Sequence, residues 1–362
     1  MGHKILIVSS LFPLPTAPHR GQFVSDQVRL LRESGHDVRV IAPVPWLPKW
    51  AEKSRPNFKG VSKSPRYFEF EKTPVFSPRF IAFPNQPFPS ISIKSASNSM
   101  KKVVKFLGDW KPEIVHIHTL FPIFKLGKKL SEYYSTPLVA TVHGWDFDYA
   151  LEYRRLAKHQ KKCIPQLDKL ITINDAHKEI GIKLGLSKEK VSVIPCHVYV
   201  LEKYHREFNS DSKNLTKLKI LFPADPNRKE KDYPLFESVI NELEKRSIKS
   251  EVKTLGGVER EKVWEMMHWA DMALLTSFRE GSPQVVKEAL KCGCKVISTD
   301  VGDVSDYLPN EAIAEKRTPE NISDKIAASL ELPDDSWSFP EIFEPSQVLS
   351  KLESVYGKVP LD

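Results

Sequence analysis

Apolar positions along the chain follow two alternating patterns from near its start to near its end. Short, mostly β-branched runs indicate strands, and longer stretches with one apolar face indicate helices. Residues 5–9 form a run of the first kind, and residues 22–34 form a helical stretch with Val24, Val28 and Leu31 on one face. Strands separated by helices in this way predict parallel βαβ units with helices on both faces of a sheet. Further strand-like runs occupy 38–42, 114–118, 138–142, 169–173 and 191–194, and a further helical stretch covers about 93–107.

The alternation stops between about 200 and 215, where polar residues dominate. A second series of strand-like runs follows, and the tail at 347–355 has one apolar stripe. Because 362 residues are many for a single core, we predict two α/β domains, over 1–204 and 205–344, followed by a terminal helix at about 345–362. The second series of strands is predicted at 218–222, 251–255, 272–275, 295–298 and 312–314.

The segment from Arg279 to Glu288 carries the clearest chemical signal. A strand-like run at 273–277 leads into a turn that ends at Ser282, which we predict to be a helix N-cap with Pro283 as the first helical residue. The helix that follows has an apolar face and is predicted to end at Gly293.

Two carboxylates flank the first turn of this predicted helix. Glu280 precedes the turn and Glu288 lies inside the helix. The unpaired N–H groups of a first helical turn bind anions, and carboxylates accept hydrogen bonds from sugar hydroxyls. A diphosphate held between these two glutamates would fit a nucleotide-sugar site.

The spacing of Glu280 and Glu288 resembles the E-x7-E signature of family 4 glycosyltransferases, and the surrounding residues 270–302 are similar to that family throughout. Within that family, the sequence is most similar to bacterial enzymes that assemble teichuronic-acid and capsule-type polysaccharides. The resemblance implies the GT-B fold, in which two Rossmann-like domains face each other across a cleft. It also implies an N-terminal acceptor domain, a C-terminal donor domain and a last helix that crosses back onto the first domain.

The same resemblance assigns roles to individual residues. Glu280 and His143 would act at the transferred sugar, and the loop after the 218–222 strand would supply cations for the leaving diphosphate. That loop departs from the family pattern, since Ala-Asp-Pro stands at 224–226 where Gly-Arg-Leu is common, so Arg228 and Lys231 are both candidates, with Lys229 less favoured. The expected donor-binding residues are Glu288, Gly281, Ser282, Pro283, Gln284, Val285, Gly21 and Gly257.

A metal is not expected at this site. Asp146-Phe147-Asp148 reads as D-x-D, which holds a divalent cation in the GT-A glycosyltransferases, but basic groups can take the place of the metal in a chain with two halves. We therefore predict a metal-independent enzyme without a cofactor, whose donor is a UDP- or GDP-sugar.

Basic and aromatic residues are concentrated between Trp46 and Phe80, in a segment predicted to be irregular. Eight lysines and arginines and eight aromatic residues lie there, in a chain whose net charge is +8. Two interpretations are open: the segment binds an anionic membrane surface, or its aromatic residues pack on their own domain. Nothing resembles a nucleic-acid-binding motif, so no nucleic-acid partner is predicted.

The remaining features suggest a cytoplasmic protein that could be peripheral on the inner face of the membrane. The apolar run at 5–8 is too short for the core of a signal peptide, and no stretch is long enough to span a membrane. The four cysteines have neither metal-binding nor redox spacing and are expected to be buried thiols.

The family resemblance implies a retaining hexosyltransferase that moves a sugar from a nucleoside-diphosphate sugar to a lipid-linked or growing glycan acceptor in polysaccharide biosynthesis. Two alternatives remain at this point. One is a nucleotide-sugar epimerase or hydrolase on the same fold, and the other is a catalytically silent scaffold that binds a glycan or lipid.

Overall fold

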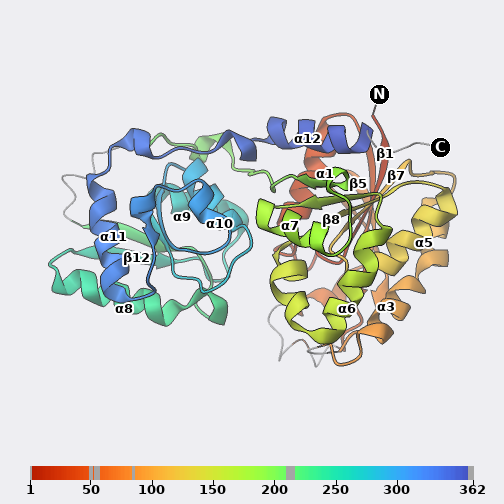
Figure 1. Cartoon of the computed structure of the whole chain (residues 1–362), viewed down its shortest axis with the longest axis horizontal. Helices are drawn as coiled ribbons and strands as arrows, with labels where there is room; N and C mark the ends of the chain where they lie inside the picture. Colours follow the sequence, from red (N-terminus) through yellow and green to blue (C-terminus); the bar gives the residue numbers. More distant parts are fainter. Residues whose placement is uncertain (1, 49–51, 53–57, 84–85, 209–216, 358–362) are drawn as a thin grey trace. The chain divides into compact units, whose positions relative to one another are not determined.

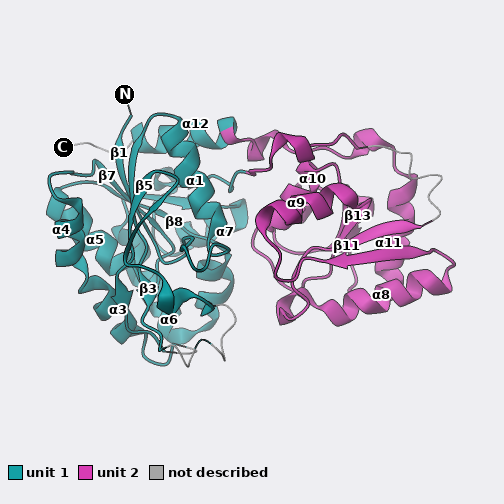
Figure 2. Cartoon of the chain, turned by 180° about the vertical axis from the view of Figure 1, so that it is seen from behind, with its two compact units in different colours: residues 1–197, 346–362 teal, residues 198–345 magenta. Residues whose placement is uncertain are grey.

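The computed structural model describes residues 2–48, 52, 58–83, 86–208 and 217–357, which form two compact units (Figure 1). Unit 1 comprises Met1–His197 and Ser346–Asp362, and unit 2 comprises Val198–Pro345 (Figure 2). The change of unit thus lies seven residues before the predicted boundary at 204/205. Val198 and Val200 are buried in the core of unit 2, and the Val198 N–H donates to the Phe343 carbonyl at 3.1 Å.

Unit 1 is built on an eight-stranded sheet with the order β10-β9-β8-β7-β1-β2-β5-β4. The neighbouring strands are parallel except β4 and β5, which form an antiparallel hairpin at one edge. A separate parallel pair joins β3 and β6. The strands are β1 Lys4–Ser9, β2 Asp37–Ile41, β3 Val44–Pro45, β4 Tyr67–Phe70, β5 Thr73–Phe76, β6 Arg79–Phe80, β7 Ile114–His118, β8 Leu138–Thr141, β9 Lys169–Thr172 and β10 Val191–Val193.

Helices cover both faces of this sheet, because the side chains of successive strand residues point to opposite sides. Leu6 and Val8 of β1 belong to one apolar core, and Ile5 and Ile7 belong to another that includes residues of α1 and α12. The terminal helix α12 is part of unit 1, with Tyr356 fully buried in this second core. The helices are α1 Gln22–Glu33, α3 Pro89–Ser97, α4 Met100–Leu107, α5 Phe124–Tyr134, α6 Arg154–Cys163, α7 Asp175–Lys183 and α12 Pro345–Gly357.

Two local predictions for unit 1 are wrong. The single helix expected over about 93–107 is two helices, α3 and α4, separated at residues 98–99. The side chains of Ser97 and Ser99 donate to the carbonyls of Lys94 and Ala96, so they compete for backbone groups where the helix is interrupted.

The second wrong prediction is the irregular character of residues 46–80, which contain β4, β5 and β6. Glu71 and Lys72 both have positive φ, as a tight hairpin turn requires. The Arg29 side chain of α1 holds this turn through a 2.7 Å hydrogen bond from Nε to Glu71 Oε2.

Unit 2 is built on a five-stranded parallel sheet with the order β12-β11-β13-β14-β15. All five predicted strands of this unit are present, and no end differs from the prediction by more than one residue. The strands are β11 Leu218–Phe222, β12 Ser250–Thr254, β13 Met272–Leu275, β14 Lys295–Thr299 and β15 Ile313–Ala314, and the helices are α8 Tyr233–Lys245, α9 Arg260–Trp269, α10 Gln284–Lys291 and α11 Pro319–Glu331.

The strand order places a topological switch point in each sheet. In unit 2 the chain passes from β11 to β12 on one side and returns to β13 on the other. In unit 1 the first strand β1 similarly lies between β2 and β7. Ligands of open α/β sheets bind outside the carboxyl ends of the strands at such points. The loops that follow β11 and β13, and those that follow β1 and β7, are therefore where a site is expected.

Candidate functional site

The loops after β11 and β13 bring Lys231 and Glu280 together in unit 2; both strands and α10 are labelled in Figure 2. The Lys231 ammonium donates to Glu280 Oε1, and the side chains are only 7% and 15% exposed. Ser277 Oγ donates to the same carboxylate oxygen at 2.7 Å. Two of the four residues predicted to be catalytic are thus direct partners at the switch point of the sheet.

Hydrogen bonds to backbone carbonyls hold the two loops against each other. Thr276 Oγ1 donates to the Lys231 carbonyl at 2.9 Å, and the Phe278 N–H donates to the Glu230 carbonyl at 3.1 Å. The position of Lys231 beside Glu280 therefore follows from the backbone of both loops as well as from the ion pair.

Arg228 lies apart from this pair. Its guanidinium binds the Glu230 carboxylate at 2.7 Å, and both side chains are exposed, at 53% and 38%. Of the two cations that the sequence left as alternatives, the structure places Lys231 next to Glu280.

The start of α10 differs by one residue from the prediction. The helix begins at Gln284 with Pro283 as its N-cap, so no side chain caps the helix at that position. Instead Ser282 Oγ donates to Asp303 Oδ2 at 2.5 Å. The Ser282 hydroxyl donates to Asp303 and accepts from the Lys287 ammonium, so both of its hydrogen-bonding roles are taken up by side chains.

Asp303 is the centre of a buried polar network behind α10. The ammonium of Lys287, which is fully buried, donates to Ser282 Oγ and lies 4.2 Å from the Phe343 ring centroid. Tyr307 Oη donates to Asp303 Oδ1 at 3.3 Å, and burial, followed by the charge of Asp303, raises the pKa of Tyr307. This network fixes the loop that leads into α10.

The loop after β14 packs tightly against the residues between Glu280 and α10. Gly302 has φ +64, and a Cβ there would lie 2.7 Å from the Gly281 carbonyl oxygen. Only glycine satisfies both conditions. The close approach of the two loops explains why a glycine follows β14.

Glu288, in the second turn of α10, has a partner that the sequence did not suggest. Arg260, the first residue of α9, lies 3.6 Å from Glu288 Oε1, and both side chains are mostly buried. The guanidinium also lies over the Trp264 ring, 5.1 Å from its centroid. No local pattern marks Arg260, because its role depends on the packing of α9 against α10.

Gly257 lies in the loop after β12. It has φ +68, and a Cβ would meet no atom within 4 Å, so its backbone is open to solvent. A Cβ on the preceding Gly256 would lie 3.5 Å from Pro226, which places this loop beside the loop after β11. Its predicted part in donor binding stays a prediction.

His143 follows β8 in unit 1 and is almost fully buried. Its Nε2 lies 3.2 Å from His118 Nδ1, and its ring centroid lies 4.5 Å from that of Phe23. Burial, followed by the charge of His177, lowers the pKa of His143 to about 3. The imidazole is therefore neutral near pH 7 and can serve as a hydrogen-bonding group but not as a cation.

The D-x-D carboxylates are occupied by protein groups. Asp146 is fully buried and accepts hydrogen bonds from the backbone N–H groups of Leu120 and His143, at 2.9 and 3.2 Å. Asp148 Oδ1 lies 2.7 Å from His177 Nε2. Asp146 thus shapes the loop that presents His143.

Gly21 is the N-cap of α1, after the loop that follows β1. It has φ +55, and a Cβ would lie 2.4 Å from the Leu11 carbonyl oxygen. The position requires glycine for both reasons.

Two sequence families match the chain, one in each unit. "Glycosyltransferase Family 4" matches residues 21–200, and "Glycosyl transferases group 1" matches residues 232–341. The chain belongs to glycosyltransferase family 4. TuaC of Bacillus subtilis (strain 168), a protein assigned as a teichuronic acid biosynthesis glycosyltransferase, is 27% identical over 84% of this chain and 83% of its own.

Solved structures share the fold of this family 4 glycosyltransferase. Starch synthase IV of Arabidopsis thaliana, in complex with ADP and acarbose, superposes with a TM-score of 0.68 at 12% identity over 99% of both chains. Anabaena HepE, in complex with UDP and glucose, superposes with a TM-score of 0.63 at 12% identity over 98% of this chain and 100% of its own. The glycosyltransferase therefore has the predicted GT-B fold with two Rossmann-like domains.

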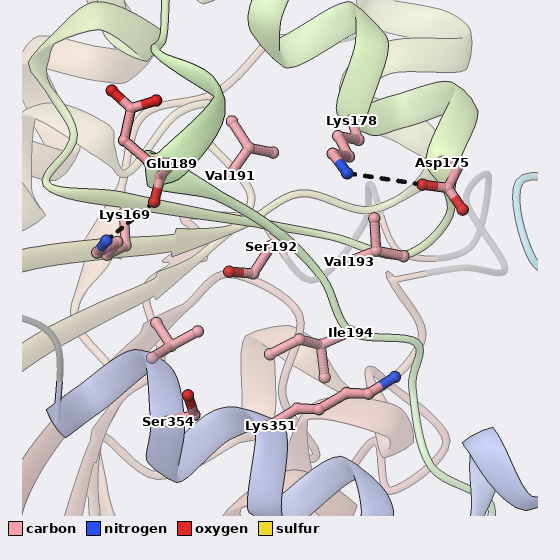
Figure 3. A pocket seen from close by; sticks show the side chains of 11 residues that line it. Lys169, Asp175, Lys178, Glu189, Val191, Ser192, Val193, Ile194, Lys351 and Ser354 are labelled. Carbon is pink, nitrogen blue, oxygen red and sulfur yellow. Dashed lines mark hydrogen bonds and ion pairs between the residues drawn. The ribbon is translucent and has the colours of Figure 1, made fainter.

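A charged hollow on unit 1 of the glycosyltransferase contains none of the candidate residues. It has a volume of about 390 Å³ and lies between the edge strand β10 and α12. Figure 3 shows Lys178 directed toward Asp175, and Lys169 toward the backbone of Glu189. These lysines have partners on their own surface, so the hollow is not part of the candidate site.

The described residues of the glycosyltransferase contain neither a membrane-spanning helix nor a cluster of metal-ligating side chains. None of its described helices is both long and apolar enough to cross a bilayer. Within those residues, no group of three His, Cys, Asp or Glu side chains is arranged to hold a metal ion.

Proposed function

We propose that this glycosyltransferase transfers a hexosyl group, with retention of configuration, from a UDP- or GDP-sugar to a lipid-linked or growing glycan acceptor in polysaccharide biosynthesis. The observation that carries the proposal is the ion pair of Lys231 and Glu280 at the switch point of unit 2, directly before the first turn of α10.

The positive groups of this site suit a leaving diphosphate. Breaking the bond between the sugar C1 and the phosphate oxygen leaves negative charge on the diphosphate. A largely buried ammonium at Lys231 and the N-terminus of α10 would stabilise that charge better than water does. Glu280 holds the ammonium in place and is suited to accept a hydrogen bond from the transferred sugar.

Retention of configuration would follow if the acceptor attacks and the diphosphate leaves on the same face of the sugar. The acceptor oxygen forms its bond to C1 on the face from which the diphosphate departs, and the acceptor proton passes to the leaving phosphate oxygen. The protein then contributes mainly electrostatic stabilisation of the diphosphate and of the positively charged sugar.

Groups in each unit, taken separately, support a reaction without a divalent cation. Lys231 supplies a positive charge that a metal would otherwise provide, and Asp146 and Asp148 hold a backbone loop and His177. We therefore propose that the enzyme works in excess EDTA.

The names of similar proteins support the substrate class. HepE was solved with UDP and glucose, and starch synthase IV with ADP, so the shared fold accommodates nucleoside diphosphates in those proteins. TuaC is named for teichuronic acid biosynthesis, which supports a polysaccharide product here.

A panel assay tests the proposal. The protein is incubated in excess EDTA with individual UDP- and GDP-sugars, with and without a prenyl-diphosphate-linked sugar as acceptor. We expect release of nucleoside diphosphate only in the presence of acceptor, and NMR of the product should show the donor's anomeric configuration. Release without acceptor would indicate a hydrolase, and a changed sugar without transfer would indicate an epimerase.

A further inference from the structure

A second cavity of about 370 Å³ lies in unit 1, at the carboxyl ends of β1 and β7. It is lined by Ser10 and Leu11 after β1, by Thr119, Phe121 and Pro122 after β7, and by parts of segments 45–47 and 80–86. Its size is within the range of small-molecule pockets. Leu11 also forms the surface against which Gly21 packs, so the cavity adjoins the loop that begins α1.

The walls of this cavity are mainly aromatic and aliphatic. Among the described residues that line it, Arg20 is the one charged side chain, and no carboxylate occurs. The aromatic residues of the wall are Trp46, Phe58, Phe80, Phe83, Phe121 and Trp145.

The basic, aromatic segment 46–80 has two interpretations from its sequence, membrane binding or internal packing. Part of this segment forms one wall of the cavity. Phe80 is buried, whereas Trp46 is 62% exposed at the cavity. Lys49, Trp50, Lys53 and Arg55 of that segment lie outside the described residues.

The aromatic wall continues onto the surface of unit 1. Phe83 contacts the exposed Phe88, with ring centroids 5.7 Å apart. Trp145 contacts Tyr149 at 5.8 Å, and Tyr149 contacts the exposed Tyr153 at 4.7 Å. An exposed aromatic surface that is continuous with an apolar cavity is typical of a site for an amphiphilic ligand.

Positive charge lies at one side of the cavity. The Arg20 side chain is held by a 3.1 Å hydrogen bond from Nη2 to the Ser10 carbonyl, and its guanidinium lies 5.5 Å from the Phe58 ring centroid. Burial, followed by the charges of Arg20 and Lys59, lowers the pKa of the neighbouring His19. A guanidinium in this setting favours a phosphate, which it can bind through two oxygens.

The polar groups are too few for a glycan. Besides Arg20, the polar groups of the lining side chains are those of Ser10, Gln86 and Thr119 and the indole N–H groups of Trp46 and Trp145, and Thr119 Oγ1 donates to the Phe121 carbonyl. A glycan buried here would leave most of its hydroxyls without partners, at a cost for each of them. An apolar chain has no hydroxyl groups, so its burial carries no such cost.

We propose that this cavity binds the apolar chain of a prenyl-phosphate-type acceptor lipid, with Arg20 at its phosphate. The inference rests on the proposed function and specifies that the acceptor is carried on a prenyl-phosphate lipid. The aromatic surface from Trp145 to Tyr153 would then lead the chain toward the bilayer from which the lipid comes.

Intrinsic tryptophan fluorescence tests the inference, because Trp46 and Trp145 line the cavity. The full-length protein is titrated with farnesyl phosphate below its micelle concentration, with farnesol, with inorganic phosphate and with glucose. We expect saturable quenching by farnesyl phosphate, affinity about tenfold lower for farnesol because the charged contact is missing, and no response to phosphate or glucose.

Two variants test the contacts to the apolar chain and to the phosphate separately. Because Trp46→Ala removes a fluorescent side chain, its binding is measured by calorimetry. Trp46→Ala changes an exposed side chain and should weaken farnesyl phosphate and farnesol alike. Arg20→Gln should weaken farnesyl phosphate and leave farnesol unchanged. The matched controls Tyr133→Ala and Arg154→Gln change exposed residues of the same unit outside the cavity and should bind as wild type.

Three results would overturn the inference: no binding of farnesyl phosphate, equal binding by both cavity variants and wild type, or binding of a glycan that Trp46→Ala abolishes. Titration of UDP and GDP on the same samples distinguishes this failure from failure of the proposed function. Intact nucleotide binding with no lipid binding would overturn the acceptor site alone.

Discussion

Glu288 contacts Arg260 and is proposed to bind the donor, and substitution of Glu288 tests the second of these roles. It lies 3.6 Å from Arg260 and in the helix whose first turn faces the proposed diphosphate. Glu288→Gln keeps the shape of the side chain but accepts hydrogen bonds less strongly. We expect the Kd of the nucleoside diphosphate to rise about tenfold, the equivalent of ~1.4 kcal/mol.

Isothermal titration with UDP and GDP measures this effect. The matched control is Glu265→Gln, which changes an exposed glutamate paired with Lys262 on α9. An unchanged Kd for Glu288→Gln would remove Glu288 from the donor site.

Single residues of the candidate site could be selected from the sequence where a local pattern marked them. Glu280 and Glu288 could be selected as candidates because strand, turn and helix follow one another within twenty residues. The choice between Arg228 and Lys231 could not be made, since it depends on which side chain reaches Glu280 from another loop. Arg260 could not be found at all, because only the packing of α9 against α10 brings it to Glu288.

Helix α10 depends on the buried polar network of Lys287, Ser282 and Asp303. Removing one partner of such a network leaves an uncompensated buried charge, which typically costs about 3–5 kcal/mol. We therefore expect Lys287→Met to lower the free energy of unfolding by this amount, although methionine keeps most of the volume of the side chain.

Urea unfolding followed by fluorescence measures the loss. Lys262→Met, at an exposed lysine of α9, is the matched control and should change the free energy little. A loss below about 1 kcal/mol for Lys287→Met would show that Asp303 finds other partners or becomes protonated.

The elements themselves were predictable where their apolar period was strong. Central parallel strands such as β1, β8 and β13 have continuous apolar runs, as strands buried on both faces do. The hairpin of β4 and β5 was missed because it lies in a basic, aromatic segment and depends on a turn held by Arg29. The division of α3 from α4 was missed because serine side chains, rather than a proline or glycine, accompany the break.

Three buried histidines make the stability of unit 1 dependent on pH. Burial lowers the pKa of His116 and His143 to about 3 and that of His118 well below its usual value, with smaller effects from neighbouring histidines. Their folded pKa values lie below the unfolded value of about 6.5, so their contribution to stability is lost as pH falls below 6.5. Burial raises the pKa of Asp146 to about 6, which acts in the opposite direction between pH 6 and about 4.

The histidines outnumber the aspartate, so we expect the free energy of unfolding to fall with decreasing pH, with a slope that approaches about 3 kcal/mol per pH unit near pH 5. Urea unfolding at pH 7.5, 6.0 and 5.0 measures it. Constant or rising stability over this range would show that the histidines are hydrated or protonated in the folded protein.

Association with an anionic membrane surface is a separate proposal. Lys59, Lys63 and Arg66 are exposed in the described part of the basic segment. Each basic residue near an anionic surface contributes about 1 kcal/mol, an attraction that salt screens. We expect replacement of all three by serine to reduce flotation with anionic liposomes at low salt.

Wild-type flotation should weaken as salt rises, and neutral liposomes should bind little. Replacement of Lys125, Lys128 and Lys129 on α5 by serine removes the same charge elsewhere on unit 1 and is the control. Equal loss in both variants would show that net charge alone drives the binding.

The most direct test of the donor site is calorimetric titration. UDP, GDP and the corresponding nucleosides, uridine and guanosine, are titrated into wild type, Lys231→Met and Lys229→Met. Lys229 is exposed and two residues from Lys231, so it controls for the loss of a nearby charge. We predict that one diphosphate binds wild type more tightly than its nucleoside, and that Lys231→Met removes most of this difference, about tenfold or more, while Lys229→Met retains it. Failure of both diphosphates to bind wild type, or undiminished diphosphate affinity in Lys231→Met, would contradict the proposed donor site.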